Sequence, residues 1–365
     1  MRLPALTAIT LNPDGGGVAT VARLVRQVMR EEWGPDCPVY ELSDTAGTVP
    51  TLDRVAQRLR FGARVVSAEL MGRSSWFFHT HLGLARVHRV VPRRLGRPYG
   101  VFVYGIEVWS PLAEADKRLL DGAELVVACS AHTARRACEI NPGLPPIAVC
   151  PLGLSAVAPS PPNRASISGS TVLTVARMAS TERYKGHDQL IEALPNLRRH
   201  VPDARLVFVG TGDDVERLRI KARDHGVGDH VVFTGFLPDH ALRQAYWDAT
   251  VFAMPSRGEG FGLTYLEAMS AGLPCVGSVH DAAPEIVEDG VTGFLVDQGN
   301  KAQLVDRLRV LLTEPTRRLE MGGHGRARWE RDFTYEQFRR RFMAVLRPAF
   351  HLRTSVEPAH SSVRG

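Results

Sequence analysis

The stretch from residue 250 to residue 299 constrains the fold more than any other part of this sequence. A short apolar run, Val251 to Met254, is typical of a buried strand, and a glycine-rich loop, Ser256 to Gly262, follows it. Apolar residues then recur at helical spacing from Leu263 to Leu273, and Pro274 to Ser278 is the next apolar run. The order strand, loop, helix, strand is the repeating unit of parallel α/β sheets.

This loop brings polar chemistry to the start of a helix. The first backbone N–H groups of a helix have no partner within it and its N-terminal end is electropositive, so anions bind there. Gly260 and Gly262 allow an anionic ligand to approach those amides. Two carboxylates, Glu259 and Glu267, lie eight positions apart, about two helical turns. Taken alone, Glu259 is also explained as a partner of the helix dipole and Glu267 as solvated surface.

The string EGFGLTYLEAMSAGLPCV, followed by EIVEDGVTGFLV, closely resembles the donor-site signature of family 4 glycosyltransferases, which have the GT-B fold. That resemblance implies an α/β chain with two Rossmann-like, doubly wound domains that face each other across a cleft. It implies that Glu259 faces the hydroxyls of the donor sugar and that Glu267 holds the ribose. The amides expected to meet the diphosphate and the sugar are those of Phe261, Gly262, Leu263 and Thr264.

The length of 365 residues suggests two domains, and a segment rich in proline and serine separates them. We predict an acceptor-side domain over residues 1–155, a linker over 156–170 and a nucleotide-sugar donor domain over 171–333. By the same resemblance, a final helix over 334–350 crosses back to the first domain. The polar residues 351–365 are expected to form a disordered tail.

Further donor-site candidates follow the strands predicted for the second domain. Arg177 ends its first strand, and Lys185 precedes a helix. Two permanent cations suit a diphosphate leaving group, because arginine donates parallel bonds and lysine is a compact charge. In isolation, each cation is also typical of plain surface. The resemblance further places Gly212 near the phosphates and Phe236 with Leu237 near the nucleobase.

The first domain carries weaker signals. Gly16 and Gly17 lie between a predicted strand and a predicted helix, where a simple turn is one explanation and a loop facing the donor phosphates is the one that the resemblance implies. Many family members place a histidine in the loop after the strand predicted for residues 99–104. The matching residue here is Tyr104, so no catalytic histidine is transferred to this chain. Glu107 in the same loop is an acceptor-side candidate.

Two histidines, His79 and His81, end the strand predicted for residues 76–81. At this spacing on a strand they would point the same way, which suits a metal ion. No third ligand stands out, and we predict neither a metal nor another cofactor. The resemblance makes both histidines acceptor-side candidates instead.

Positive charge is concentrated in one segment. Between Arg54 and Arg97 the chain has ten arginines and one acidic residue, Glu69. The net charge of this segment therefore exceeds the net charge of +6 of the whole chain. Three explanations are open. The segment is a solvated basic face, a surface that binds anionic lipid or a lipid-diphosphate acceptor, or a nucleic-acid site. No nucleic-acid motif accompanies the charge, so we expect no nucleic-acid partner. Pro92 interrupts the segment, which is therefore not a long amphipathic anchor.

The cysteines and the apolar runs indicate a compartment. The five cysteines are scattered and form no Cys-x-x-Cys pair, which suits reduced thiols. No apolar run approaches the roughly 20 residues that span a bilayer, and the start of the chain lacks the apolar core of a signal peptide. We expect a cytoplasmic protein that is peripheral at the inner membrane face.

Together these observations predict a retaining glycosyltransferase that moves a sugar from a UDP- or GDP-sugar to an acceptor hydroxyl. The catalytic candidates are Glu259, Arg177 and Lys185, and the two cations with the helix dipole do the work of a metal ion. No carboxylate nucleophile is evident, so we favour attack on the face that the leaving phosphate departs from. A lipid-linked or envelope glycan is the expected acceptor. The alternatives are a soluble sugar-phosphate or small-metabolite acceptor, a GT-B sugar-nucleotide epimerase, and an inactive nucleotide-sugar-binding scaffold.

Overall fold

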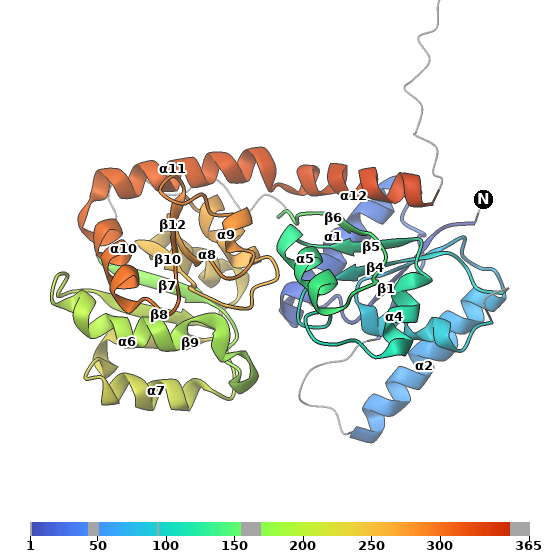
Figure 1. The fold of residues 1–365 in the computed structure, drawn as a ribbon, viewed down its shortest axis with the longest axis horizontal. Coiled ribbons are helices and arrows are strands. Elements are labelled where there is room, and N and C mark those ends of the chain that lie inside the picture. The colour runs from blue at the N-terminus through green and yellow to red at the C-terminus, as the bar shows by residue number, and fades with distance from the viewer. Residues whose placement is uncertain (1, 43–50, 93–94, 155–168, 351–365) are drawn as a thin grey trace, which may run out of the picture.

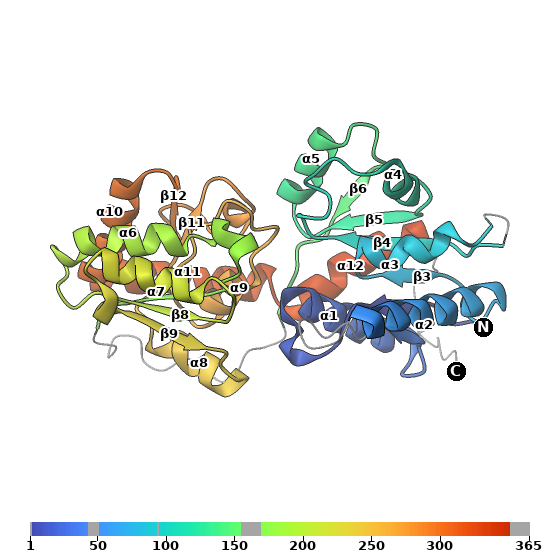
Figure 2. The same ribbon diagram turned by 90° about the horizontal axis from the view of Figure 1, so that it is seen from below.

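A computed structural model describes residues 2–42, 51–92, 95–154 and 169–350 of the chain. Within these residues, two parallel sheets of six strands each lie side by side, each covered by helices (Figures 1 and 2). Strands buried on both faces are expected to be near-continuous apolar runs, and the fully buried Val251–Ala253 is an example. Most of the predicted linker and the predicted tail lie outside the described residues.

The N-terminal sheet has the strand order β2-β1-β3-β4-β5-β6. Helix α1 packs on one face, while α2, α3, α4 and α5 contribute to the core of the other. The strands are β1 (Ala5–Ala8), β2 (Val39–Glu41), β3 (Phe77–His79), β4 (Tyr99–Val103), β5 (Leu125–Ala128) and β6 (Ile147–Val149). The helices are α1 (Gly16–Trp33), α2 (Thr51–Leu70), α3 (Leu82–Ala85), α4 (Glu114–Asp121) and α5 (Ala131–Ile140).

The C-terminal sheet has the order β12-β11-β10-β7-β8-β9. Helices α6, α7 and α10 share one core with it, and α8, α9 and α11 share the other. The strands are β7 (Thr171–Val175), β8 (Arg205–Val209), β9 (Val231–Gly235), β10 (Val251–Ala253), β11 (Cys275–Ser278) and β12 (Gly293–Val296). The helices are α6 (His187–Arg198), α7 (Val215–Asp224), α8 (Asp239–Asp248), α9 (Leu263–Ser270), α10 (Lys301–Thr313) and α11 (Pro315–Asp332).

Helix α11 runs along the C-terminal half. The last described helix, α12 (Tyr335–Ala349), continues from it and lies on the N-terminal sheet (Figure 1). Its buried Phe342 contacts Phe78 of β3 and Phe102 of β4, with ring centroids 5.0 and 6.5 Å away. Just before α12, the carbonyl of Phe333 accepts the N–H of Leu154. A single apolar core therefore runs from the first sheet through α12 into the second.

Most predicted elements are present, but the strand predicted for residues 76–81 is too long. β3 ends at His79, and His81 instead caps α3 by accepting the amide N–H of Gly83 at its Nδ1. The two histidines therefore do not lie on one strand. The sequence patterns also failed to single out α4, α11 and β12.

Candidate active site

The loop between β10 and α9 places Glu259 close to the start of a helix. The N-cap of α9 is Gly262, whose φ of 101° lies in the left-handed region that favours glycine. A Cβ at this position would lie 2.5 Å from the Tyr265 ring, so the site needs glycine for space as well. Because glycine offers no capping side chain, the amides of Leu263 and Thr264 keep the anion-binding character of a helix start.

Glu259 is paired with Lys185. The Nζ of Lys185 donates to Oε2 of Glu259 at 2.8 Å, and both side chains are mostly buried. Burial alone would lower the pKa of Lys185, but the charge of Glu259 and this hydrogen bond raise it to about 12. The sequence predicted both residues, yet not that the cation expected on the diphosphate would touch the carboxylate expected on the sugar.

A second carboxylate, Asp281, holds the backbone of the same loop. Its Oδ2 accepts the N–H of Glu259 at 3.2 Å and its Oδ1 accepts the N–H of Ala283 at 3.0 Å. Burial is the main cause that raises the pKa of Asp281 to about 7, and the nearby charge of Glu259 adds to it. Sequence reasoning missed this residue, because an aspartate after a buried strand has no distinctive spacing.

Arg177 follows β7 and is the more accessible of the two predicted cations. Its side chain is 73% exposed and is paired with Glu182. Glu182 lies in the short turn that leads to Lys185. Lys185 is thus held inside the site, while Arg177 lies at its surface.

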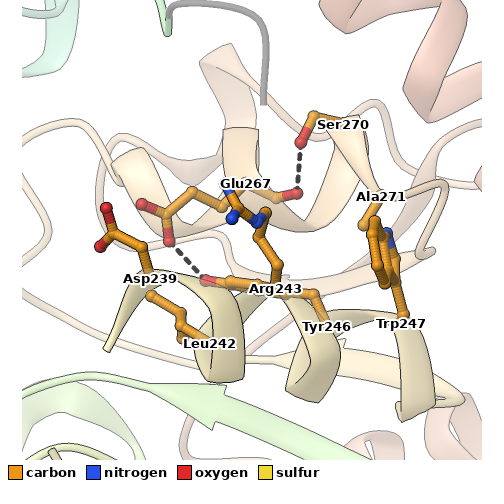
Figure 3. Close-up of a pocket in the computed structure, with 8 residues that line it drawn as sticks. All are labelled: Asp239, Leu242, Arg243, Tyr246, Trp247, Glu267, Ser270 and Ala271. Carbon is orange, nitrogen blue, oxygen red and sulfur yellow. Dashed lines mark hydrogen bonds between the residues drawn. The ribbon is translucent and has the colours of Figure 1, made fainter. Parts of the chain in front are cut away.

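Glu267 lines a cavity of about 230 Å³ between α8 and α9 (Figure 3). Its Oε2 accepts the hydroxyl of Tyr246 at 2.6 Å. Burial raises the pKa of Glu267 to about 7; the bond from Tyr246 opposes this shift, and the charge of Asp239 adds to it. The carboxylate expected to hold the ribose therefore titrates near neutral pH.

The loops after β8 and β9 meet beside this region. The N–H of Gly210 donates to the carbonyl of Gly235 at 2.9 Å, and a Cβ on Gly212 would lie 2.0 Å from the carbonyl oxygen of Met178. Phe236 follows with 59% of its surface exposed. An exposed aromatic ring at the end of a parallel strand is well suited to stack on a base. Leu237, also predicted here, packs against the core.

The glycine loop of the N-terminal half lies against the start of α9. Helix α1 begins at Gly16, whose φ is 71°. A Cβ on Gly17 would lie 3.8 Å from Cδ1 of Leu263. The structure therefore brings two predicted donor regions, from opposite halves of the chain, to one place.

Residues that were not predicted join the two halves at this loop. The carbonyl of Gly260 accepts the hydroxyls of Ser130 at 2.6 Å and Thr133 at 3.1 Å. The carboxylate of Glu285 accepts the N–H groups of Ala131 and His132, at 2.9 and 2.6 Å. Ser130 is also the N-cap of α5, where its side chain accepts the N–H of Thr133. No sequence spacing relates these residues, since more than 120 positions separate Thr133 from Gly260.

Of the acceptor-side candidates, His79 has both of its ring nitrogens close to protein partners. It is fully buried, with Nδ1 2.8 Å from the Thr7 hydroxyl and Nε2 2.8 Å from Nε2 of His88. Burial first, and His88 second, hold the pKa of His79 well below its ordinary value. This placement argues against the predicted role, since both ring nitrogens already have protein partners.

His81 and Glu107, by contrast, are only partly buried. The Nδ1 of His81 accepts an N–H, so the neutral ring carries its proton on Nε2. Burial lowers the pKa of His81, which the charge of Glu107 opposes. Glu107 itself accepts the N–H groups of Tyr104 and Gly105, and so shapes its own loop. The hydroxyl of Tyr104 donates to the Thr80 carbonyl.

The basic segment is less uniform than its composition indicates. Arg86 and Arg89 both bind the carboxylate of Asp116, which lies outside the segment. Arg93 and Arg94 lie outside the described residues. On α2, by contrast, exposed arginines alternate with exposed apolar side chains, among them Leu59 at 69% exposure.

The described residues contain neither a membrane-spanning helix nor a metal-ligand cluster. Among them, no helix is both long and apolar enough to cross a membrane. In the same part of the chain, no three histidine, cysteine or acidic side chains gather as metal ligands.

Solved structures define the class of fold. Sucrose-phosphate synthase from Thermosynechococcus elongatus superposes on 96% of this chain and 100% of its own with a TM-score of 0.81, at 19% identity. HepE from Anabaena, solved in complex with UDP and glucose, covers 95% of this chain and 99% of its own with a TM-score of 0.75, also at 19% identity. The chain has the GT-B fold, which confirms the fold predicted from the sequence.

Sequence comparison then gives the family. Residues 166–328 match the family described as glycosyl transferases group 1. A GDP-mannose-dependent alpha-(1-6)-phosphatidylinositol monomannoside mannosyltransferase of Mycobacterium tuberculosis is 35% identical over 253 residues, or 63% of this chain. The match spans 65% of that relative, slightly under two thirds of its length. The part of the chain that carries the donor-site signature therefore matches the group 1 glycosyltransferases, the family that the signature resembles.

Proposed function

We propose that the chain transfers mannose from GDP-mannose to a hydroxyl of a membrane glycolipid, with retention at the anomeric carbon. The observation that carries this proposal is the Glu259–Lys185 pair at the start of α9, in a chain similar to a GDP-mannose-dependent phosphatidylinositol monomannoside mannosyltransferase. Residues 1–155 would then form the acceptor side and residues 171–333 the donor side of the cleft.

The donor residues would act on the leaving diphosphate. Lys185 and Arg177, with the amides at the start of α9, would stabilise the negative charge that develops as the bond from the anomeric carbon to the phosphate oxygen breaks. Only interactions that strengthen in the transition state raise the rate. Glu259 would orient the sugar through its hydroxyls, and Glu267 would hold the ribose.

The acceptor would attack on the face that the phosphate leaves. Its hydroxyl oxygen forms the new bond to the anomeric carbon, and its proton passes to the departing phosphate oxygen. This route needs no carboxylate nucleophile. Glu107, whose charge acts on the ring of His81, stays an acceptor-side candidate.

The outer face of α2 would place the protein on its acceptor's membrane. Exposed Val55 and Leu59 would enter the headgroup region, while exposed Arg58 and Arg60 attract anionic lipid. We therefore infer a cytoplasmic protein that is peripheral at the membrane.

The test incubates the purified protein with radiolabelled GDP-mannose or UDP-glucose and with vesicles that contain phosphatidylinositol mannosides. We expect label from GDP-mannose in the lipid fraction. Transfer to a soluble sugar phosphate would replace the lipid acceptor, and turnover without acceptor would indicate an epimerase or a hydrolase. A thermal-shift series with GDP, UDP and ADP identifies the base independently, because a ligand of the folded state raises its stability. A shift with one nucleotide but no turnover with any acceptor would indicate an inactive scaffold, and the absence of a shift with all three would contradict the proposed donor site.

A further inference from the structure

The donor loop is held from the opposite side of the cleft. Ser130 and Thr133 follow β5 of the N-terminal sheet, whereas Gly260 adjoins Glu259 in the C-terminal half. Ser130 Oγ accepts the N–H of Thr133 at 3.0 Å, so its own proton is directed to the Gly260 carbonyl 2.6 Å away. The Sγ of Cys129 adds a weaker bond to the same oxygen at 3.3 Å.

Thr133 joins two carbonyls that would otherwise repel each other. Its hydroxyl lies 3.2 Å from the Tyr104 carbonyl and 3.1 Å from that of Gly260. A Cβ on Gly260 would lie 1.8 Å from the Tyr104 oxygen, so this approach requires glycine at position 260. Ser130 and Thr133 are both fully buried, so neither hydroxyl has water as an alternative partner in this arrangement.

A second contact secures the other end of the loop's support. Glu285 caps the N-terminus of α5 by accepting two of its amides, where the helix dipole favours a carboxylate. Glu285 belongs to the turn that begins two residues after Asp281, and Asp281 accepts the N–H of Glu259. The N-terminal half thus contacts the donor loop directly at Gly260 and, through Glu285, the turn that follows Asp281.

We propose that Ser130, Thr133 and Glu285 are positioning residues that hold the loop of Glu259 from the opposite half of the chain. Loss of their hydrogen bonds leaves the Gly260 carbonyl and the N-terminus of α5 without these partners, and the Glu259 loop relaxes. Transfer then slows. This inference rests on the proposed function for its kinetic consequence, but not for its structural one.

The test uses Thr133→Val, which keeps the side-chain volume and the helix and removes only the donor, with Thr133→Ser as the matched control. Ser130→Asp keeps an acceptor for the helix N-cap but directs a carboxylate at the Gly260 carbonyl, with Ser130→Thr as its control. Circular dichroism confirms that each variant is folded.

The first readout is hydrogen exchange of the loop, residues 256–262, which needs no substrate. We expect it to quicken about tenfold in Thr133→Val, the factor set by one lost hydrogen bond, and to stay near wild type in Thr133→Ser. The second readout is transfer: kcat should fall about tenfold while the Kd of GDP is nearly unchanged, because neither Thr133 nor Ser130 is among the residues expected to hold the nucleotide.

Unchanged loop exchange in both Thr133→Val and Ser130→Asp would overturn the inference, whatever the activity. If exchange quickens and the wild type transfers no sugar, the three residues still hold the loop, but the proposed function fails. If exchange quickens and kcat is unchanged in an active enzyme, the residues hold the loop without positioning Glu259, which also overturns the proposal.

Discussion

At the scale of single residues, the pairing of Lys185 with Glu259 makes the donor site a unit whose parts cannot be changed singly. The two side chains share a mostly buried ion pair, so removal of one leaves an uncompensated charge on the other. A lone buried carboxylate would raise its pKa, lose its charge or draw in water.

Lys185→Ala should therefore lower kcat/KM for the donor by about 10²-fold, the usual effect of removing one group that stabilises the transition state. Lys301→Ala is the matched control, because Lys301 forms a half-exposed ion pair with Glu192 elsewhere on the same half. Steady-state kinetics of both variants check the prediction. Normal kinetics in Lys185→Ala would remove this residue from the site.

The pKa of Glu267 gives a dependence on pH. This pKa is raised from 4.5 to about 7, so between these values the folded state binds more protons than the unfolded state. The contribution of Glu267 to the free energy of unfolding is therefore fully present below pH 4.5, and it decreases as the pH rises towards 7. Binding has the opposite sign, since ribose hydroxyls donate to the ionised carboxylate.

We predict that affinity for GDP rises as the pH increases from 6 to 8, by up to about tenfold. In Glu267→Gln this pH dependence of the affinity should vanish. Titration calorimetry measures both proteins, and the difference between them removes the contribution from ionisation of the GDP phosphate. Tyr246→Phe should move the midpoint upward, because the Tyr246 hydroxyl stabilises the charged form. An identical pH profile in Glu267→Gln would assign the titration to Asp281 instead.

At the scale of elements, α2 carries exposed apolar side chains next to exposed arginines. If its outer face binds lipid, Leu59→Asp should weaken binding to vesicles of phosphatidylinositol. Added salt should weaken the binding of the wild-type protein to the same vesicles. Ile220→Asp on α7 is the control, because it places the same charge at an exposed apolar position of the other half. Co-sedimentation at two salt concentrations measures both effects. Salt-insensitive binding, or none, would make α2 ordinary surface.

The strands and helices that surround the donor site could be predicted because their apolar patterns are regular. The run before Glu259 is β10, and the helical pattern after Gly262 is α9. The pattern of α11 was missed because polar and charged residues fill most of it. The partners of the donor loop were missed for a different reason: Thr133 and Gly260 meet only because two sheets face each other.

At the scale of the whole molecule, α12 ties the two sheets together. Phe342 is fully buried and contacts Phe78, Phe102 and Phe338. Phe342→Ala should lower the free energy of unfolding by about 3–5 kcal/mol through lost burial and a cavity. Phe236→Ala, at an exposed ring, should change it by less than about 0.5 kcal/mol. Urea denaturation compares the two, and a small effect at Phe342 would mean that α12 is not part of the N-terminal core.

The path of α12 also bears on how the protein is made. The N-terminal sheet is complete in sequence by residue 149, yet the ring that fills its inner face belongs to residue 342. Domains generally fold as units and N-terminal ones first during synthesis, at about 5–20 residues per second. Here the first half waits for nearly two hundred further residues, roughly 10–40 seconds of translation, with Phe78 and Phe102 lacking their final neighbour. The nascent chain thus carries an unfinished apolar surface that α12 covers later.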